Sequence, residues 1–199
     1  MVAVNNLLSH LWVARVWQNL RAKRISIWQC YFNRLSWLAL IPAVSVYIGF
    51  TQVGWVLGGS ERNFLTPESG LMLGATLYIG IILGISCIGK GIHWMEKTYG
   101  SGSSYRTCVV LATYVSTPVL LGSVVFVWPI LWLVLTVLSL TAAISIYLMF
   151  IGVNVMMQVQ ENRGTLYSVS IMTIALCVFV GMIITEVVLF STVLTLTIR

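Results

Sequence analysis

No charged residue occurs between Thr107 and Val153, and this uncharged run constrains the fold more than any other feature of the chain. As a single helix it would be about 70 Å long, at a rise of about 1.5 Å per residue. The hydrocarbon core of a bilayer is only about 30 Å thick. The run must therefore turn back, and the pair Trp128 and Pro129 predicts where, because proline is tolerated in the first turn of a helix. The two halves are predicted to form an antiparallel hairpin of membrane-spanning helices.

The composition of the whole chain fits the same class of protein. Of its 199 residues, 59% are hydrophobic and 8% are charged, which is far from the balance of a soluble domain. An all-α polytopic membrane bundle of five transmembrane helices is predicted, in one domain over residues 35–199, preceded by a short basic and aromatic segment over residues 1–34. The five predicted spans are Leu35–Leu57, Ser69–Ile92, Arg106–Val127, Trp128–Val153 and Val169 to about Leu189.

The distribution of Lys and Arg predicts the orientation of these spans. The segments on the side of the N-terminus carry nine of these basic residues and the segments on the other side carry two. Cytoplasmic segments are the ones enriched in Lys and Arg, so we expect a cytoplasmic N-terminus and an extracytoplasmic C-terminus in the inner (plasma) membrane. The net charge of +6 therefore reflects topology, and no nucleic acid is expected as a partner.

The N-terminal segment mixes basic and aromatic residues, and two arrangements suit it equally. It forms an interfacial helix on the cytoplasmic headgroups, or a short helix packed on the cytoplasmic ends of the spans. We expect basic residues here and after the second span to meet anionic lipid headgroups, namely Arg21, Lys23, Arg24, Lys90 and Lys97.

Small residues line one side of the second predicted span. Gly70 and Gly74, and again Gly80 and Gly84, follow the G-x-x-x-G spacing that lets another helix backbone approach closely. Packing within the subunit is favoured, because a five-helix bundle needs such faces for itself. The alternative is a homo-oligomer.

The third span contains a proline among hydroxyl side chains. Pro118 has no N–H and frees the carbonyl of Tyr114, so we expect the helix to bend there, with Ser116 and Thr117 bonding to nearby carbonyls. One interpretation is a purely structural kink. The other is a polar pocket lined by Thr113, Tyr114 and Thr117.

Glu186 is the only acidic residue inside a long apolar run. Counted from Tyr167, it lies about 28 Å along a helix, near the far edge of the hydrocarbon layer. We therefore expect a carboxyl near the outer interface that hydrogen-bonds to Gln52 at the end of the first span. The alternative is an acid that carries a proton or binds an ion.

Three motifs in order along the chain resemble the Yip domain family: the first-span run Ile41–Trp55, Tyr114-x-x-x-Pro118, and Tyr147-x-x-x-x-Gly152. Within that family the chain resembles the YohC-like bacterial inner-membrane branch, over roughly residues 35–190. The resemblance implies a five-span membrane domain. Eukaryotic members bind prenylated small GTPases and each other. This chain lacks their acidic Asp-containing motif and long N-terminal region, so GTPase binding is not expected.

No catalytic or cofactor motif stands out in the sequence. His93, Met95 and Glu96 are too close together to be expected on one face, so no metal site is predicted. The four cysteines have no C-x-x-C spacing and suit packing.

We expect a non-enzymatic membrane protein that organises the membrane or contacts partners through helix packing and lipids. Those partners are lipids, a second copy or other membrane proteins. The alternative is a small transporter or channel subunit with a polar site near Tyr114 and Glu186.

The predicted orientation can be tested with reporter fusions after Ser60 and Gly102, which follow the first and second spans. An alkaline phosphatase fusion should be active at Ser60, and a fluorescent protein fusion should be bright at Gly102, because an odd number of spans separates the two sites from each other. Both sites reporting the same side of the membrane would contradict the topology.

Overall fold

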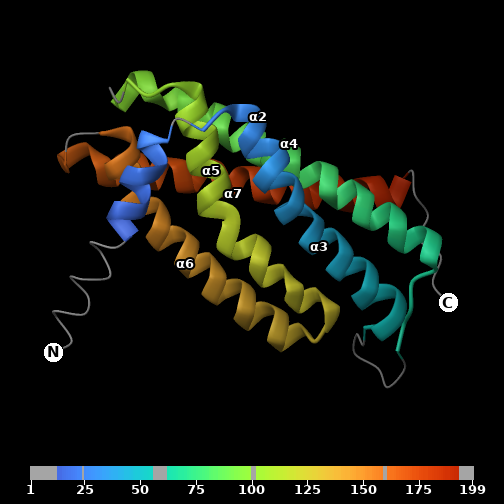
Figure 1. Ribbon diagram of the computed structural model, residues 1–199. Coiled ribbons are helices and arrows are strands. Elements are labelled where there is room, and N and C mark those ends of the chain that lie inside the picture. The colour runs from blue at the N-terminus through green and yellow to red at the C-terminus, as the bar shows by residue number, and fades with distance from the viewer. Residues whose placement is uncertain (1–12, 24, 56–61, 100–101, 159–160, 193–199) are drawn as a thin grey trace, which may run out of the picture.

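The computed structural model describes residues 13–23, 25–55, 62–99, 102–158 and 161–192, and within them the chain is a bundle of helices (Figure 1). The single pairing of extended backbone in these residues is a bridge between Trp55 and Asn63. The elements are α2 (Ile27–Cys30), η1 (Tyr31–Leu35), α3 (Ser36–Ile48), η2 (Gly49–Val53), α4 (Pro67–Tyr99), α5 (Tyr105–Gly122), η3 (Ser123–Val127), α6 (Leu131–Met157) and α7 (Glu161–Thr192).

Five helices are long and apolar enough to cross a membrane, which confirms the predicted fold class. They are Ile27–Val53, Pro67–Glu96, Tyr105–Val127, Leu131–Met157 and Arg163–Ser191. The first begins eight residues earlier than the sequence predicted. Its start is stabilised by Gln29, whose Oε1 accepts a hydrogen bond from the Ser26 N–H at 3.2 Å.

The first span contains two wide, π-helical turns, η1 and η2. At the end of η1 the backbone N–H of Ser36 bonds to the carbonyl of Tyr31, five residues back, and the Ser36 hydroxyl donates to the same oxygen at 2.9 Å. This double contact holds the i−5 register. The wide turn rotates the residues before it relative to α3, and it includes Arg34.

The predicted hairpin is confirmed. α5 and α6 lie side by side along their length (Figure 1) and are joined by the tighter 3₁₀ turn η3. The reversal falls at Trp128, whose N–H bonds to the carbonyl of Val125 and whose carbonyl accepts from Ile130. Just before η3, α5 and α6 approach closely because Gly122 has no side chain: a Cβ there would lie 2.5 Å from the Thr141 side chain of α6.

α5 is the central helix of the bundle. It packs against α3, α4 and α6, while α7 packs against α4 and α6 at the side. The side chains of Val109 and Leu111 on α5 are fully or almost fully buried. A hydrogen bond connects the outer helix α7 to α4: the Tyr167 hydroxyl donates to the Ile92 carbonyl at 2.9 Å.

Residues 13–22 form a further helix that packs on one end of the bundle. Its Trp17 is 3% exposed, and a Cβ at Gly152 of α6 would lie 2.9 Å from that indole ring. The described part of the N-terminal segment thus packs on the ends of the helices, in one of the two predicted arrangements. Contact of this helix with lipid headgroups stays a prediction, and residues 5–12 lie outside the described part of the chain.

The tightest helix contact predicts a stability effect. A Cβ at Gly49 would clash with the backbone carbonyl of Phe126 in η3, so Gly49→Ala must push the first span away from the α5–α6 hairpin. We expect a loss of about 1–3 kcal/mol in the free energy of unfolding, measured by denaturation in mixed micelles. Gly181→Ala on α7 is the matched control, because nothing lies within 4 Å of its added Cβ. Equal stability of the two variants would contradict the packing.

Candidate functional site

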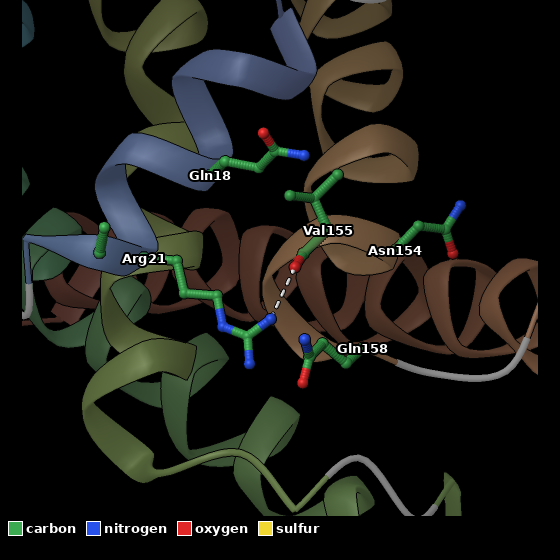
Figure 2. Close-up of a pocket in the computed structure, with 6 residues that line it drawn as sticks. Gln18, Arg21, Asn154, Val155 and Gln158 are labelled. Carbon is green, nitrogen blue, oxygen red and sulfur yellow. Dashed lines mark hydrogen bonds between the residues drawn. The ribbon is translucent and has the colours of Figure 1, made fainter.

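Polar side chains gather where residues 13–23 and 25–34 lie against α5 and α6, a region that we call the junction. The junction contains two pockets. The first has a volume of about 600 Å³ and is shown in Figure 2. It is lined by Gln18, Arg21, Ala22, Asn154, Val155 and Gln158.

Arg21 bridges the two walls of this first pocket. Its Nη1 donates to the Val155 carbonyl at 3.4 Å, as Figure 2 shows. The last carbonyls of a helix have no partner within it and carry partial negative charge, so a cation is favourable there. α6 ends just beyond, at Gln158, in a left-handed conformation with φ of 50°. Arg21 is exposed, as a lipid-facing residue would be, but it also bonds to the bundle.

The second pocket has a volume of about 290 Å³ and lies between the start of the first span and α5. Its central contact is a cation–π pair, in which the guanidinium carbon of Arg34 lies 3.9 Å from the centre of the Tyr114 ring. The same Tyr114 ring lies 6.3 Å from the Trp17 ring, so it contacts both parts of the N-terminal segment. The lining residues are Ile25, Gln29, Cys30, Asn33, Arg34 and Tyr114.

Of the three α5 residues that the sequence predicts around a pocket, only Tyr114 lines this one. The hydroxyl of Thr113 is buried and donates to the Val109 carbonyl at 2.9 Å, while Thr117 donates to the Thr113 carbonyl at 3.0 Å. Ser116 likewise donates to the Ala112 carbonyl, so the expected back-bonding occurs. α5 stays helical past Pro118 to Gly122, and the bend at this proline stays a prediction.

Arg34 is the residue at this site that sequence reasoning missed. It lies 80 positions before Tyr114, and no local pattern links the two residues. One feature of the sequence could have indicated it: Arg34 is the one Lys or Arg between Ile27 and Val53, the first span. A cation in an apolar span indicates a specific partner.

Glu186 has a different partner from the expected one. The Thr76 hydroxyl of α4 lies 3.0 Å from Glu186 Oε2, whereas Gln52 is exposed and makes no such contact. The expectation of a Gln52 bond was wrong because α7 packs against α4 and not against the first span. Thr76 Oγ1 also lies 3.0 Å from the Met72 carbonyl, so its single proton serves one of these acceptors at a time.

The four glycines of α4 face two different neighbours within the chain. A Cβ at Gly70 would clash with the Thr51 side chain, and one at Gly74 would lie 3.1 Å from the Ala43 carbonyl, both in the first span. On the adjacent side, a Cβ at Gly84 would lie 2.7 Å from Met182 of α7, and a Cβ at Gly80 would lie 3.5 Å from the Glu186 carboxylate. These close approaches let α4 pack between the first and last spans.

The remaining predicted residues lie outside these contacts. The side chains of Lys23 and Lys90 are exposed, while those of Arg24 and Lys97 fall outside the described part of the structure. His93 and Glu96 share a face after all, with Nδ1 and Oε2 3.0 Å apart. The described residues hold no group of three metal-ligating side chains of the His, Cys, Asp and Glu types.

The Thr76–Glu186 contact predicts an energetic coupling between α4 and α7. A double-mutant cycle with Thr76→Val and Glu186→Leu should give a coupling of about 0.6 kcal/mol, and at most about 1.7 kcal/mol, in mixed-micelle unfolding. These values are the average and the maximum for hydrogen bonds between membrane helices. Glu186→Gln should keep the wild-type stability, because its amide can still bond to the Thr76 hydroxyl. Gln52→Leu is the control and should show no coupling to Glu186→Leu. Coupling between Gln52 and Glu186, with none between Thr76 and Glu186, would contradict the Thr76 contact.

Comparison with known proteins assigns the family. The family model for the Yip1 domain matches residues 9–182, which includes most of the N-terminal segment as well as the spans. The chain is 30% identical over 193 residues to inner membrane protein YohC of Escherichia coli K12, covering 94% of this chain and 95% of the relative. The YohC protein of Escherichia coli O6:H1 gives the same values. No solved structure matches the chain. The chain therefore belongs to the Yip1 domain family.

Proposed function

We propose that this protein is a non-enzymatic inner-membrane protein that organises its membrane through contacts with lipids and with other membrane proteins. Its N-terminus lies in the cytoplasm and its C-terminus outside. Membership of the Yip1 family and the similarity to an inner membrane protein support the location.

The surface of α7 carries this proposal. None of the residues in its most apolar stretch is buried, and large apolar side chains point outward over about 33 Å of the helix, enough to cross the hydrocarbon core. The exposed residues are Leu166, Val169, Met172, Leu176, Phe179, Val180, Ile183, Ile184, Val187 and Val188. A surface of this length and composition suits lipid chains and the apolar faces of other membrane helices.

The transporter or channel alternative requires a connected polar path. Tyr114 packs with Arg34 and Trp17 in the junction, whereas Glu186 bonds to Thr76 between α4 and α7. Neither pocket of the junction includes Glu186. The separate partners of these two residues favour the lipid-contact role.

Spin labelling in bilayers tests the proposal. We replace the four native cysteines by serine and attach a label at Phe179→Cys, with Ile171→Cys on the same helix as the buried control. Lipid-soluble oxygen should relax the label at 179 much more strongly than a water-soluble nickel complex does, because the site faces hydrocarbon or another helix. The label at 171 should respond weakly to both. A nickel-dominated response at 179 would show a water-filled path and contradict the proposal.

A further inference from the structure

The Arg34 guanidinium has no carboxylate partner among the described residues, although it lies inside a membrane span. It follows the start of the span at Ile27 by about 10 Å along the helix axis. Among the described residues an ion pair joins His93 and Glu96, far along the chain from Arg34. The lining of the second junction pocket includes no acidic residue. A charge taken partly out of water without a counterion is unfavourable, so an anion is expected from outside the chain.

The hydrogen-bonding groups of Arg34 are also incompletely used. Its Nε atom is buried and has no acceptor in the structure. The Tyr114 ring at 3.9 Å attracts the cation through its face but accepts no strong hydrogen bond there. A guanidinium presents its N–H groups in a planar fork that matches two oxygens of one anion.

Neutral donors surround this guanidinium. Gln29 uses its Oε1 to accept from the Ser26 N–H, which leaves its –NH₂ group as a donor. Asn33 and Tyr114 add a second amide and a phenolic hydroxyl to the lining. A pocket with one fixed cation, several neutral donors and no carboxylate suits an oxyanion with several oxygens, of which phosphate is the one abundant at membrane surfaces.

The position of the pocket matches the depth of lipid phosphates. Beside it, Trp28 and Phe32 stack with ring centres 5.7 Å apart and are 72% and 64% exposed. Exposed aromatic residues at the end of a span belong at the boundary between hydrocarbon and headgroups. Arg34 therefore lies within reach of that boundary.

We propose that the pocket around Arg34 and Tyr114 binds a phosphate group at the membrane surface. The phosphate comes from an anionic lipid headgroup or from free phosphate. This inference rests on the proposed lipid-contact function and names the chemistry of one contact site.

Native mass spectrometry of the full-length protein in detergent, titrated with dioleoylphosphatidylglycerol, tests the proposal. Arg34→Gln should weaken binding of the first lipid by about tenfold or more, the effect of losing a charge-assisted hydrogen bond. Arg163→Gln is the matched control, because it removes the same charge from an exposed position on α7. We expect its affinity to equal that of the wild type. Equal affinity of Arg34→Gln and the wild type would overturn the site.

Two gentler changes cover the case in which Arg34→Gln does not fold. Arg34→Lys keeps the charge but loses the fork, and the double variant Gln29→Ala with Asn33→Ala removes two neutral donors. Each should bind the first lipid more weakly than Arg163→Gln does. Wild-type affinity in both would overturn the proposal.

Competition separates the two sources of phosphate. Displacement of the first lipid by millimolar inorganic phosphate, but not by equal sodium chloride, identifies a site that also takes free phosphate. Resistance to inorganic phosphate, with affinity still dependent on Arg34, identifies a lipid headgroup site. Both results support phosphate recognition.

The phosphate site and the proposed function can fail separately. If Arg34 variants bind lipid normally while the label at 179 faces hydrocarbon, the phosphate site is wrong and the proposed function stands.

Discussion

The bilayer core supplies no water to bond to backbone groups, and the rest of the structure depends on this constraint. Every N–H and carbonyl in a span must find its partner inside the protein, which only helices achieve within one segment. The hydroxyl side chains obey the same rule. Three hydroxyl residues precede the proline of α5, namely Thr113, Ser116 and Thr117. Each donates to a carbonyl four residues back on its own helix. α5, which contains this proline and these hydroxyl side chains, is also the most buried of the five spans.

Close backbone approach then organises the helices around α5, since lipid gives apolar helices no hydrophobic reason to associate. Gly49 sits against the carbonyl of Phe126, Gly74 against that of Ala43, and Gly84 against Met182. These contacts hold the first span, the hairpin and α7 in place. The helix of residues 13–22 is held differently, by burying Trp17 against Gly152 and Tyr114.

The polar groups divide into two kinds of site. Glu186 has a hydrogen-bond partner within the chain, Thr76 on the neighbouring helix α4. In the junction, Arg34 lies over the face of the Tyr114 ring, and its buried Nε has no acceptor among the described residues. A hydrogen-bonded pair between two helices suits a structural role, whereas a cation with an unpaired N–H beside exposed aromatic residues suits an external ligand.

The sequence by itself determined the membrane class, the five helices and the reversal at Trp128, because hydrocarbon thickness limits an apolar run directly and proline marks a helix start. The family was also evident from motifs within single spans. Only the tertiary structure decided which polar groups meet. Glu186 could not be matched to Thr76, nor Arg34 to Tyr114, because depth along a helix is readable from sequence while the choice of neighbouring helix is not. That choice depends on which faces pack together. The start of the first span was misplaced by eight residues because the polar stretch before Leu35 is held helical by the Ser26–Gln29 contact and by packing on α5.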